Sequence, residues 1–449
     1  MITPRTVSGT LELLPRQQII HQHMIDVIRR GFERFGFLPV ETPVFELKEV
    51  LLTKSGGETE KQVYFVQSTG SLQQGYVPDM ALRFDLTTPL ARYVAQYERD
   101  LAFPFRRYQI QRVYRGERPQ RGREREFYQC DIDVIGKDKL TPLYDAELPA
   151  IIVQIFDTLK VGPFTIHFNN RKILRGLVQG YGLTDPETQI LVLREIDKLD
   201  KIGAEKVLAS LIGLGLAESD AQNLMELIGH KGSKDDVLAA LQALPVEDPL
   251  FRQGVEEVTQ MVAALRALGV PEERTRLNLS IARGLDYYTG TVYETTLDAH
   301  PEFGSVCSGG RYDDLASHYT KSKLPGVGIS IGLTRLFELL EDTGLLPETP
   351  PLVQILVAQL DPALTPLYLS LATELRAACF RVDAWLEPAK LDKQIKFADK
   401  NGIPIVLLLG AEEAAESSVT VKDMKAKTQT RVARNNLIGF LSPLFDVRA

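Results

Sequence analysis

The sequence predicts a mixed α/β (α+β) protein of several domains, and three observations lead to this prediction. Residues 105–136 read as two alternating strands joined by a polar loop, which together form a long antiparallel hairpin. Residues 170–265 contain short amphipathic helices separated by glycine-containing breaks. Beyond residue 353, apolar runs alternate with helix-like stretches, as in a small α/β domain. For 449 residues, a prior of roughly 150 residues per domain gives about three domains.

Composition limits the classes of protein to which this chain can belong. Hydrophobic residues make up 44% and charged residues 25% of the chain, which suits a globular protein with a large core. The net charge of −7 argues against a protein that only binds nucleic acid, but it allows an enzyme with local basic patches. No apolar run is long enough to span a bilayer, so no membrane partner is expected.

Cysteine and histidine usage predicts no disulfide framework and no metal ligands. Cys130, Cys307 and Cys379 are far apart and have no metal-ligand spacing, and the six histidines are not paired with them. Free cysteines of this kind fit a reducing cytoplasm, which is the expected location.

The first 92 residues predict a helix, an edge segment and a strand-to-helix turn. Apolar residues recur at helical spacing over residues 17–35, and Gly36 ends the helix. Residues 37–44 are extended, and their two prolines suit a sheet edge or an interface, although a plain connection fits equally well. In residues 82–92 a strand end turns into a helix with Pro89 in its first turn. Asp85 and Thr87 face one way there, so they either hold an ammonium group or cap the helix.

The hairpin carries the densest concentration of arginine. Its predicted strands are Phe105–Arg115 and Phe127–Ile135, and the second strand places Gln129, Asp131 and Asp133 on one face. Guanidinium groups suit phosphate oxygens, and rows of Gln and Asp suit a small polar ligand. Burying arginines beside carboxylates is costly without a ligand, which favours a polyphosphate site over a solvated charged hairpin. The arginines are Arg106, Arg107, Arg112, Arg115, Arg118, Arg121, Arg123 and Arg125.

Three later blocks carry possible ligand contacts, each with a plain structural alternative. Residues 283–288 (Arg-Gly-Leu-Asp-Tyr-Tyr) suggest close backbone approach to a ligand, or a tyrosine-lined core. Residues 308–313 (Ser-Gly-Gly-Arg-Tyr-Asp) predict a tight turn whose glycines free backbone amides, or an ordinary turn between strands. Residues 326–332 predict a buried strand that runs into a helix with Arg335 in its first turn, where it either binds an anion or lies at the surface.

The remaining segments predict domain organisation rather than chemistry. The helices of residues 187–199, 205–212 and 220–228 indicate a helical insertion that contacts a partner. A proline-rich linker leads to the C-terminal α/β domain, in which Lys390, Lys393, Lys396 and Lys400 form a charged helix face. Such a face is usually solvated, and contact with a phosphate backbone is the alternative.

Together and in this order, these blocks resemble the histidyl-tRNA synthetases, a family of class II aminoacyl-tRNA synthetases. The region around Pro43 resembles the first class motif, the hairpin with Arg115-Gly116-Glu117 the second, and Gly326–Arg335 the third. The blocks at 283–288 and 308–313 match the two signatures peculiar to this family. The resemblance implies an antiparallel-sheet catalytic domain (1–170 and 262–343), a helical insertion domain (171–261), a linker (344–352) and an anticodon-binding domain (353–449).

The resemblance also implies the reaction and its residues. ATP and histidine would give histidyl-adenylate, whose histidyl group passes to tRNA(His), with Mg²⁺ assisting and with a homodimer as the functional unit. Arg115, Arg283 and Arg335 would be catalytic, and Arg115, Glu117 and Arg335 would bind ATP. The implied histidine pocket consists of Asp85, Thr87, Gln129, Asp133, Arg283, Tyr287 and Tyr288. Two rivals are a histidine-binding regulatory subunit of ATP phosphoribosyltransferase and a catalytically silent paralogue; the first typically lacks the C-terminal domain and the arginine at 283.

Overall fold

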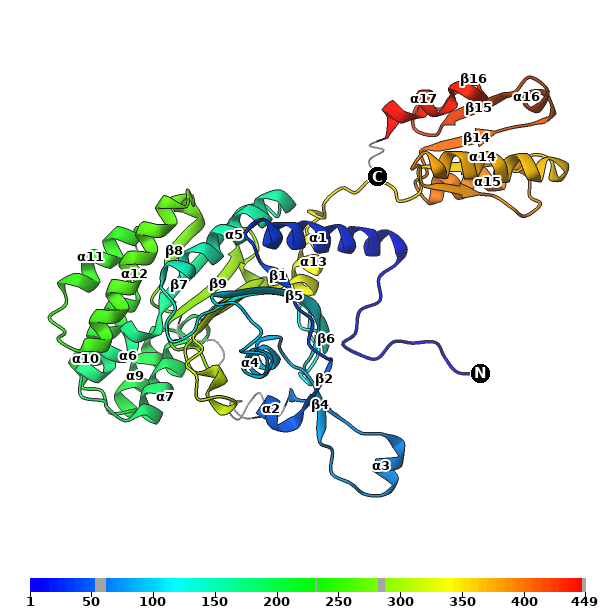
Figure 1. The fold of residues 1–449 in the computed structure, drawn as a ribbon. Helices are drawn as coiled ribbons and strands as arrows, with labels where there is room; N and C mark the ends of the chain where they lie inside the picture. Colours follow the sequence, from blue (N-terminus) through cyan, green and yellow to red (C-terminus); the bar gives the residue numbers. More distant parts are fainter. Residues whose placement is uncertain (53–61, 231, 282–286, 446–449) are drawn as a thin grey trace. The chain divides into compact units, whose positions relative to one another are not determined.

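The computed structural model describes residues 1–52, 62–230, 232–281 and 287–445. They form two compact units, Met1–Pro347 and Glu348–Ala449, so the division between the units lies within the predicted linker. Figure 1 traces both units along the chain. Within the described ranges, no helix has the length and apolar character needed to cross a membrane.

The first unit is built on an eight-stranded, mostly antiparallel sheet, as counted in the described residues. Only the pairs β1–β5 and β7–β8 are parallel. The proline-containing β1 lies at one edge, which confirms the predicted edge segment. Across the sheet the strands are β1 (Leu38–Pro39), β5 (Phe105–Tyr114), β6 (Glu126–Ile135), β11 (Gly326–Gly332), β10 (Cys307–Tyr312), β9 (Thr291–Leu297), β7 (Phe164–Asn170) and β8 (Thr275–Leu277).

The two faces of this sheet have opposite character. Alternate residues of β6, namely Cys130, Ile132 and Val134, are fully buried in the apolar core under α1 (Pro15–Arg34) and α5 (Leu143–Leu159). Helix α13 (Leu333–Asp342) packs on the same face, where Phe337 contacts His21 of α1. On the opposite, polar face, α4 (Thr87–Gln96) lies within the curve of the sheet (Figure 1).

The helical segment between β7 and β8 extends beyond the helices predicted from the sequence. Residues 187–199, 205–212 and 220–228 correspond to α7 with α8, α9 and α10, whereas α6, α11 and α12 were not predicted. Helices α6 and α12 pack closely at Gly176. A Cβ there would lie only 2.2 Å from the Phe251 nitrogen, so a larger residue would not fit. Helix α12 runs without a break across residue 261, the predicted end of the insertion. The helices are α6 (Arg171–Gly180), α7 (Pro186–Ile196), α8 (Leu199–Ile202), α9 (Ala204–Gly213), α10 (Glu218–Ile228), α11 (Lys234–Ala243) and α12 (Pro249–Ala267).

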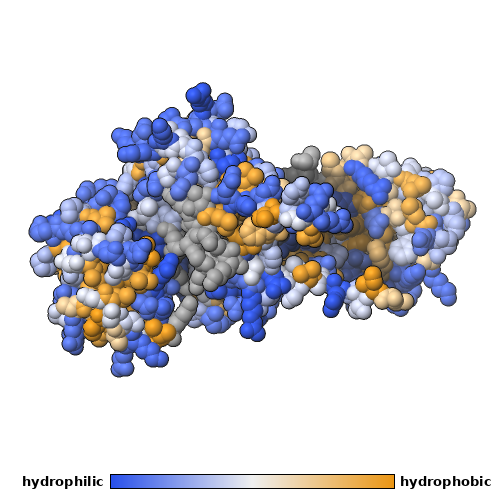
Figure 2. Space-filling view, turned by 90° about the horizontal axis from the view of Figure 1, so that it is seen from below, coloured by the Kyte–Doolittle hydropathy of each residue, from blue (hydrophilic) through white to orange (hydrophobic). Residues whose placement is uncertain are grey.

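A small sheet in the first unit leaves large apolar side chains exposed. It consists of β2 (Phe45–Leu47), β4 (Met80–Leu82) and β3 (Phe65–Val66), accompanied by α2 (Lys48–Leu52) and α3 (Thr69–Gln73). Phe45 is 53% exposed, Leu47 47% and Phe65 49%. On the face of the molecule shown in Figure 2, hydrophobic patches likewise lie among hydrophilic side chains.

The second unit is an α/β domain, as predicted. Its sheet has the order β13-β12-β14-β15-β16, and residues of β12 are buried on both faces. The strands are β12 (Ile355–Val357), β13 (Val382–Ala384), β14 (Ile405–Leu408), β15 (Ser418–Asp423) and β16 (Thr428–Ala433). The helices are α14 (Thr365–Ala377), α15 (Leu391–Lys400), α16 (Ala411–Ala415) and α17 (Leu437–Leu441). Short 3₁₀ turns occur in both units at Glu272–Arg274, Pro301–Phe303, Leu315–His318, Pro362–Leu364, Arg434–Asn436 and Ser442–Leu444.

The prediction of a tight turn at residues 308–313 was wrong. Residues 308–312 belong to strand β10, which pairs with β9 on one side and β11 on the other. Its glycines permit close packing rather than a turn, since a Cβ on Gly309 would lie 2.2 Å from the Gly328 carbonyl oxygen.

Candidate active site

Three neighbouring strands form the floor of a polar pocket. On this face β6 presents Asp131 and Asp133, and the register places Ser330 of β11 beside Asp131 and Gly328 beside Asp133. A Cβ on Gly328 would lie 2.0 Å from Asp133 Oδ1, so glycine is needed to leave room for the carboxylate. The small cavity above the floor is lined by Thr87, Asp131, Asp133, Tyr288, Ser308, Gly309, Tyr312, Gly328, Ile329 and Ser330.

Asp133 is buried in an ion pair with an arginine. Its Oδ2 lies 2.7 Å from Nη2 of Arg107, which is fully buried, and its Oδ1 accepts a 2.6 Å hydrogen bond from the Tyr312 hydroxyl. Arg107 also donates to the Leu86 carbonyl at 3.2 Å, which joins the floor to the start of α4. Burial raises the pKa of Asp133, and Arg107 opposes that rise.

Asp85 and Thr87 stand at the start of α4. Asp85 accepts hydrogen bonds from the backbone nitrogen and the hydroxyl of Thr88, both at 3.0 Å, so its carboxylate does cap the helix. The same carboxylate lies 3.4 Å from the Tyr287 hydroxyl, and Thr87 lines the cavity. The two sequence interpretations are therefore compatible, because the capping carboxylate also faces the pocket. Burial raises the pKa of Asp85.

Tyr287 and Tyr288 form an aromatic wall of the pocket together with Tyr312. The Tyr287 ring lies edge-on to Tyr288 at 4.9 Å and to Tyr312 at 6.0 Å between centroids. Burial raises the pKa of Tyr287 and of Tyr288, so both hydroxyls remain hydrogen-bond donors at neutral pH. The other member of this predicted group, Arg283, lies outside the described residues.

The predicted ATP-binding residues cluster around the hairpin. Arg115 is half-buried, donates from Nε to the Phe84 carbonyl at 3.0 Å and stacks over the Phe127 ring at 5.1 Å. Glu117 Oε2 lies 3.8 Å from Nη1 of Arg123. Arg335 enters from α13, donates to the Ser305 carbonyl at 2.8 Å and packs under the hairpin loop at Gly122.

The loop of the hairpin also agrees in part with the alternative of a solvated charged segment. In the loop, the side chains of Arg121 and Arg123 are 66% and 49% exposed, and Arg112 near the end of β5 is 49% exposed. Arg107, by contrast, is buried against the pocket. The arginine-rich stretch thus combines pocket residues with solvated ones.

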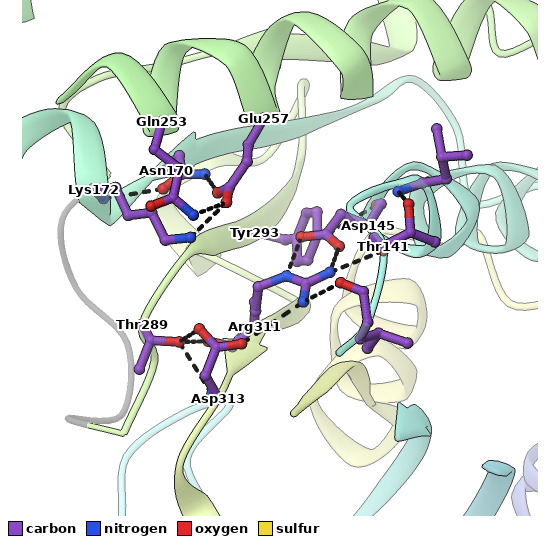
Figure 3. A network of polar contacts seen from close by, with 12 residues as sticks. Thr141, Asp145, Asn170, Lys172, Gln253, Glu257, Thr289, Tyr293, Arg311 and Asp313 are labelled. Atoms are coloured by element: carbon purple, nitrogen blue, oxygen red, sulfur yellow. Dashed lines mark hydrogen bonds and ion pairs between the residues drawn. The ribbon is translucent and has the colours of Figure 1, made fainter. Parts of the chain in front are cut away.

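In residues 308–313, the second family signature, the side chains point to both faces of the sheet. Ser308 and Tyr312 face the pocket, whereas Arg311 points away from it toward α5 (Figure 3). Arg311 Nε donates to Asp145 Oδ1 at 3.1 Å, and Nη2 pairs with Asp145 Oδ2. The remaining guanidinium donors reach the Leu140 and Thr141 carbonyls, each at 3.1 Å. Arg311 therefore supports the sheet from behind.

Buried polar atoms without partners are concentrated on the pocket face. Among the described residues, these atoms include Nε and Nη1 of Arg107, Oε1 of Gln109, Oε1 of Gln129 and Oδ1 of Asp131. All four residues lie on one face of β5 and β6. Native proteins satisfy nearly all buried polar groups, so such a cluster indicates a site that awaits a polar ligand.

Comparison with known protein families agrees with this geometry. Residues 9–336 match the family model described as histidyl-tRNA synthetase, and residues 354–444 match an anticodon binding domain. The chain belongs to the histidyl-tRNA synthetase family. Two relatives, both named histidine–tRNA ligase, come from Stenotrophomonas maltophilia (56% identical) and Xylella fastidiosa (55% identical), and each alignment covers 98% of both chains.

Solved structures give the same family fold. The crystal structure of histidyl-tRNA synthetase from Nostoc sp. PCC 7120 is 40% identical and has a TM-score of 0.88, with 99% of this chain and 100% of that chain covered. A structure from Bacillus halodurans C described as an ATP phosphoribosyltransferase regulatory subunit/histidyl-tRNA synthetase is 20% identical, with a TM-score of 0.74 over 88% of this chain and 97% of that chain. At that identity the second likeness shows only a shared fold.

Three residues that face the synthetase pocket were not among the predicted site residues. Arg107 and Asp131 lie on the same sheet face as Gln129 and Asp133. The two-residue alternation of the strands could therefore have identified both as pocket residues. Tyr312 alternates with Gly310 in the second signature, but the turn prediction hid its direction. Correct assignment of β10 as a strand would have identified it.

Proposed function

We propose that this protein is a histidine–tRNA ligase that activates histidine with ATP and transfers the histidyl group from histidyl-adenylate to tRNA(His). The observation that carries this proposal is the cluster of unpartnered buried polar atoms beside Asp133 and the tyrosine wall, in a chain of the histidyl-tRNA synthetase family. The predicted C-terminal anticodon-binding domain has a family match at residues 354–444, a domain that the regulatory rival typically lacks.

The pocket supports a division of labour around the amino acid. Asp85 and Thr87 would hold the α-ammonium group, and Gln129 would position the substrate from the adjoining strand. Asp133 and Tyr288 would bind the imidazole nitrogens. Because these groups are buried, an amino acid without matching donors and acceptors would leave them unpaired, which gives strong discrimination.

The hairpin and α13 support the nucleotide end of the reaction. Arg115 and Arg335 would bind ATP phosphates, and Glu117 would hold the adenine end. Among the described residues, no three His, Cys, Asp or Glu side chains gather to hold a metal. Mg²⁺ would enter with ATP and be held by phosphate oxygens together with one or two carboxylates, the arrangement that Mg²⁺ commonly adopts at phosphate sites.

The chemistry requires positioning and charge neutralisation rather than a protein nucleophile. The histidine carboxylate attacks the α-phosphorus, pyrophosphate leaves, and the terminal ribose hydroxyl of tRNA then takes the histidyl group. Arg115, Arg283 and Arg335 would neutralise the charge that develops on the phosphate. Arg283→Ala is expected to slow adenylation in single-turnover kinetics by about 10²-fold or more. The exposed Arg276→Ala is the control, and a near-normal rate for Arg283→Ala would refute its role.

The domain assignments follow from the same family. The catalytic domain would comprise residues 1–170 and a second part that follows the helical insertion; because α12 continues to Ala267, the insertion would end there rather than at residue 261. Residues 344–352 would link it to the anticodon-binding domain 353–449. The insertion would contact a partner, for which the tRNA is the proposed candidate. The free Cys130, Cys307 and Cys379 support a cytoplasmic location.

A homodimer would cover the exposed apolar side chains near the first class motif. Leu38, Phe45 and Leu47 flank Pro43 and are 60%, 53% and 47% exposed. Isolated apolar residues are normal on a surface, so the proposal rests on the presence of three large ones within ten residues of the motif that resembles a dimer interface. Light scattering of the purified protein should give twice the chain mass, and a Phe45→Glu variant should shift this mass toward that of the monomer.

The decisive experiment is ATP–pyrophosphate exchange with each amino acid in turn. Exchange that depends on histidine alone is the expected result. Histidine binding without exchange would instead favour a regulatory or silent relative. Exchange driven by another amino acid would mean that the pocket has been assigned the wrong substrate.

A further inference from the structure

Asp131 is the buried carboxylate of the pocket floor to which no function has yet been assigned. It is 3% exposed, and the Ser330 hydroxyl lowers its pKa by hydrogen bonding to the carboxyl group. Its Oδ1 has no partner among the described residues. The Ser330 hydroxyl in turn accepts a 3.1 Å hydrogen bond from Gln129 Nε2, which leaves its proton for Asp131.

Asp131 differs from Asp133, two residues away, in having no counter-ion in the part of the chain that the structure describes. Asp133 has Arg107 as a counter-ion at 2.7 Å, whereas within the described ranges Asp131 has no ion pair. A buried carboxylate without a counter-ion and beside a second carboxylate is stable either in its protonated form or against a ligand that donates a proton. The free Oδ1 therefore calls for a donor from the substrate.

The position of Asp131 indicates which part of the substrate this donor belongs to. Asp131 lines the same small cavity as Asp133 and Tyr288, the proposed partners of the imidazole ring. Of the two proposed partners of the α-ammonium group, Thr87 also lines this cavity, whereas Asp85 is not among its lining residues. Because Asp133 and Tyr288 flank Asp131 in this cavity, we assign the unpartnered Oδ1 to an imidazole nitrogen of the substrate.

We propose that Asp131 is a further specificity-determining residue, which binds the imidazole of histidine through Oδ1 and shares one proton with the ring. This inference rests on the proposed function. Above the pKa values of both free groups, histidine must then bind together with one proton from solvent. A ring that cannot take part in such a proton bridge would be bound less tightly.

The groups around Asp131 set its pKa, and this pKa determines the pH range in which histidine binding should be measured. Burial raises the pKa of Asp131 to about 7, Arg107 lowers it, and Asp133 and Asp85 raise it. Free imidazole titrates near 6.5. Above pH 7 the dissociation constant of histidine should therefore rise with pH, and from about pH 8 the rise should approach tenfold per pH unit, the limit for uptake of one proton. The charged or titratable groups around Asp131 are Arg83, Asp85, Arg107, Cys130, Asp133, Tyr288 and Cys307.

The experiment is calorimetric titration of the full-length protein with L-histidine at pH 8 in two buffers of different ionisation enthalpy. The wild type should take up close to one proton, and Asp131→Asn should take up almost none. The same variant should weaken histidine binding at pH 7 by about 10- to 100-fold, the scale for losing a charged hydrogen bond. Ser330→Ala, which keeps the carboxylate, should retain proton uptake.

The results of this experiment distinguish failure of the Asp131 inference from failure of the proposed function. Wild-type binding without proton uptake, or an Asp131→Asn variant with the wild-type pH slope, would overturn this inference and leave the proposed function intact. Absence of histidine binding by the wild type would overturn both. Should Asp131→Asn fail to fold, Asp131→Ser replaces it, because serine is smaller and can pair with Ser330 across the strands. Retained uptake in that variant would contradict the role of Asp131.

Discussion

Two buried arginine–aspartate pairs lie on opposite faces of the same sheet, and they differ in how completely their polar atoms are satisfied. Behind the sheet, Arg311 uses its guanidinium donors on Asp145 and on the Leu140 and Thr141 carbonyls. In the pocket, Arg107 pairs with Asp133 and donates to the Leu86 carbonyl, but its Nε and Nη1 have no partner among the described residues.

This difference separates a structural pair from a binding pair. A buried donor without a partner costs roughly 1–3 kcal/mol, so it persists where another molecule supplies the partner. The satisfied Arg311 pair needs no ligand, whereas the Arg107 pair stands beside unpartnered atoms of Gln109, Gln129 and Asp131. Burial and charge are alike in the two pairs, so hydrogen-bond satisfaction is the property that distinguishes them.

The largest expected effect is on stability, from breaking the satisfied pair. Arg311→Met leaves Asp145, which is 1% exposed, without its counter-ion, and it should lower the free energy of unfolding by about 3–5 kcal/mol. Chemical denaturation measures this loss. The double variant Arg311→Met/Asp145→Leu should recover most of it, because an apolar pair of similar volume replaces the ionic one. Equal stability of the Arg311→Met variant and the wild type would remove the structural role.

The second effect is a loss of histidine activation when the Arg107–Asp133 pair, whose polar atoms are only partly satisfied, is broken. Asp133→Asn should reduce histidine-dependent pyrophosphate exchange by about 10²-fold, while it lowers the unfolding free energy by less than about 2 kcal/mol. The stability loss is smaller here because Asp131 can ionise and face Arg107. The folded fraction of Arg311→Met, in contrast, should keep its affinity for histidine. If Asp133→Asn cost more stability than Arg311→Met and left exchange unchanged, the distinction between the pairs would be reversed.

A third effect tests whether the floor needs glycine. In Gly328→Ala the new Cβ would lie 2.0 Å from Asp133 Oδ1 and 2.8 Å from the Ile132 carbonyl oxygen. The carboxylate must shift, so histidine affinity measured by calorimetry should fall about tenfold, within the range of overpacking costs. Gly213→Ala is the matched control, because a Cβ added there would have nothing within 4 Å. Unchanged affinity in Gly328→Ala would show that Asp133 does not bind the substrate.

Much of this architecture could be predicted from local patterns. The alternation in Phe127–Ile135 correctly separated the buried Cys130, Ile132 and Val134 from the polar face, and the apolar spacing before Gly36 predicted α1. Both signals are short-range, because a strand or a helix with one buried face has apolar residues at the period of that element. Of the ten predicted site residues, four lie in such elements, namely Thr87, Gln129, Asp133 and Arg335.

The sequence-based predictions failed where the role of a residue depends on a strand that is far away in the sequence. The glycines of residues 308–313 suggested a turn, but they are required by Gly328 and Tyr288, which approach from other elements. Likewise, nothing near Asp131 in the sequence reveals that Arg107 pairs with Asp133 instead. Partner choice among buried charges is set by strand register, and register becomes visible only when the whole sheet is assembled.

The smallest expected effect concerns a charge that belongs to neither buried pair. Glu338 of α13 is half-buried and accepts a 3.1 Å hydrogen bond from the backbone nitrogen of Gly122 in the hairpin loop. Burial and then the nearby Glu124 raise its pKa to about 7. A carboxyl group whose pKa is higher in the folded than in the unfolded state stabilises the fold at low pH, and this contribution is lost as the pH rises toward 7.

Glu338→Gln removes the charge and keeps an acceptor for Gly122. The variant should match the wild type in urea denaturation at about pH 4.5 and exceed its stability at pH 8 by less than about 1 kcal/mol, since solvent screens a half-exposed group. Glu12→Gln, at an exposed position, should change neither value by more than about 0.5 kcal/mol. If Glu338→Gln were instead less stable at pH 8, the ionised carboxylate would be the form that holds the loop. Its hydrogen bond to Gly122 would then outweigh the cost of burial, and satisfaction of donors would govern the rim of the site as it does the two buried pairs.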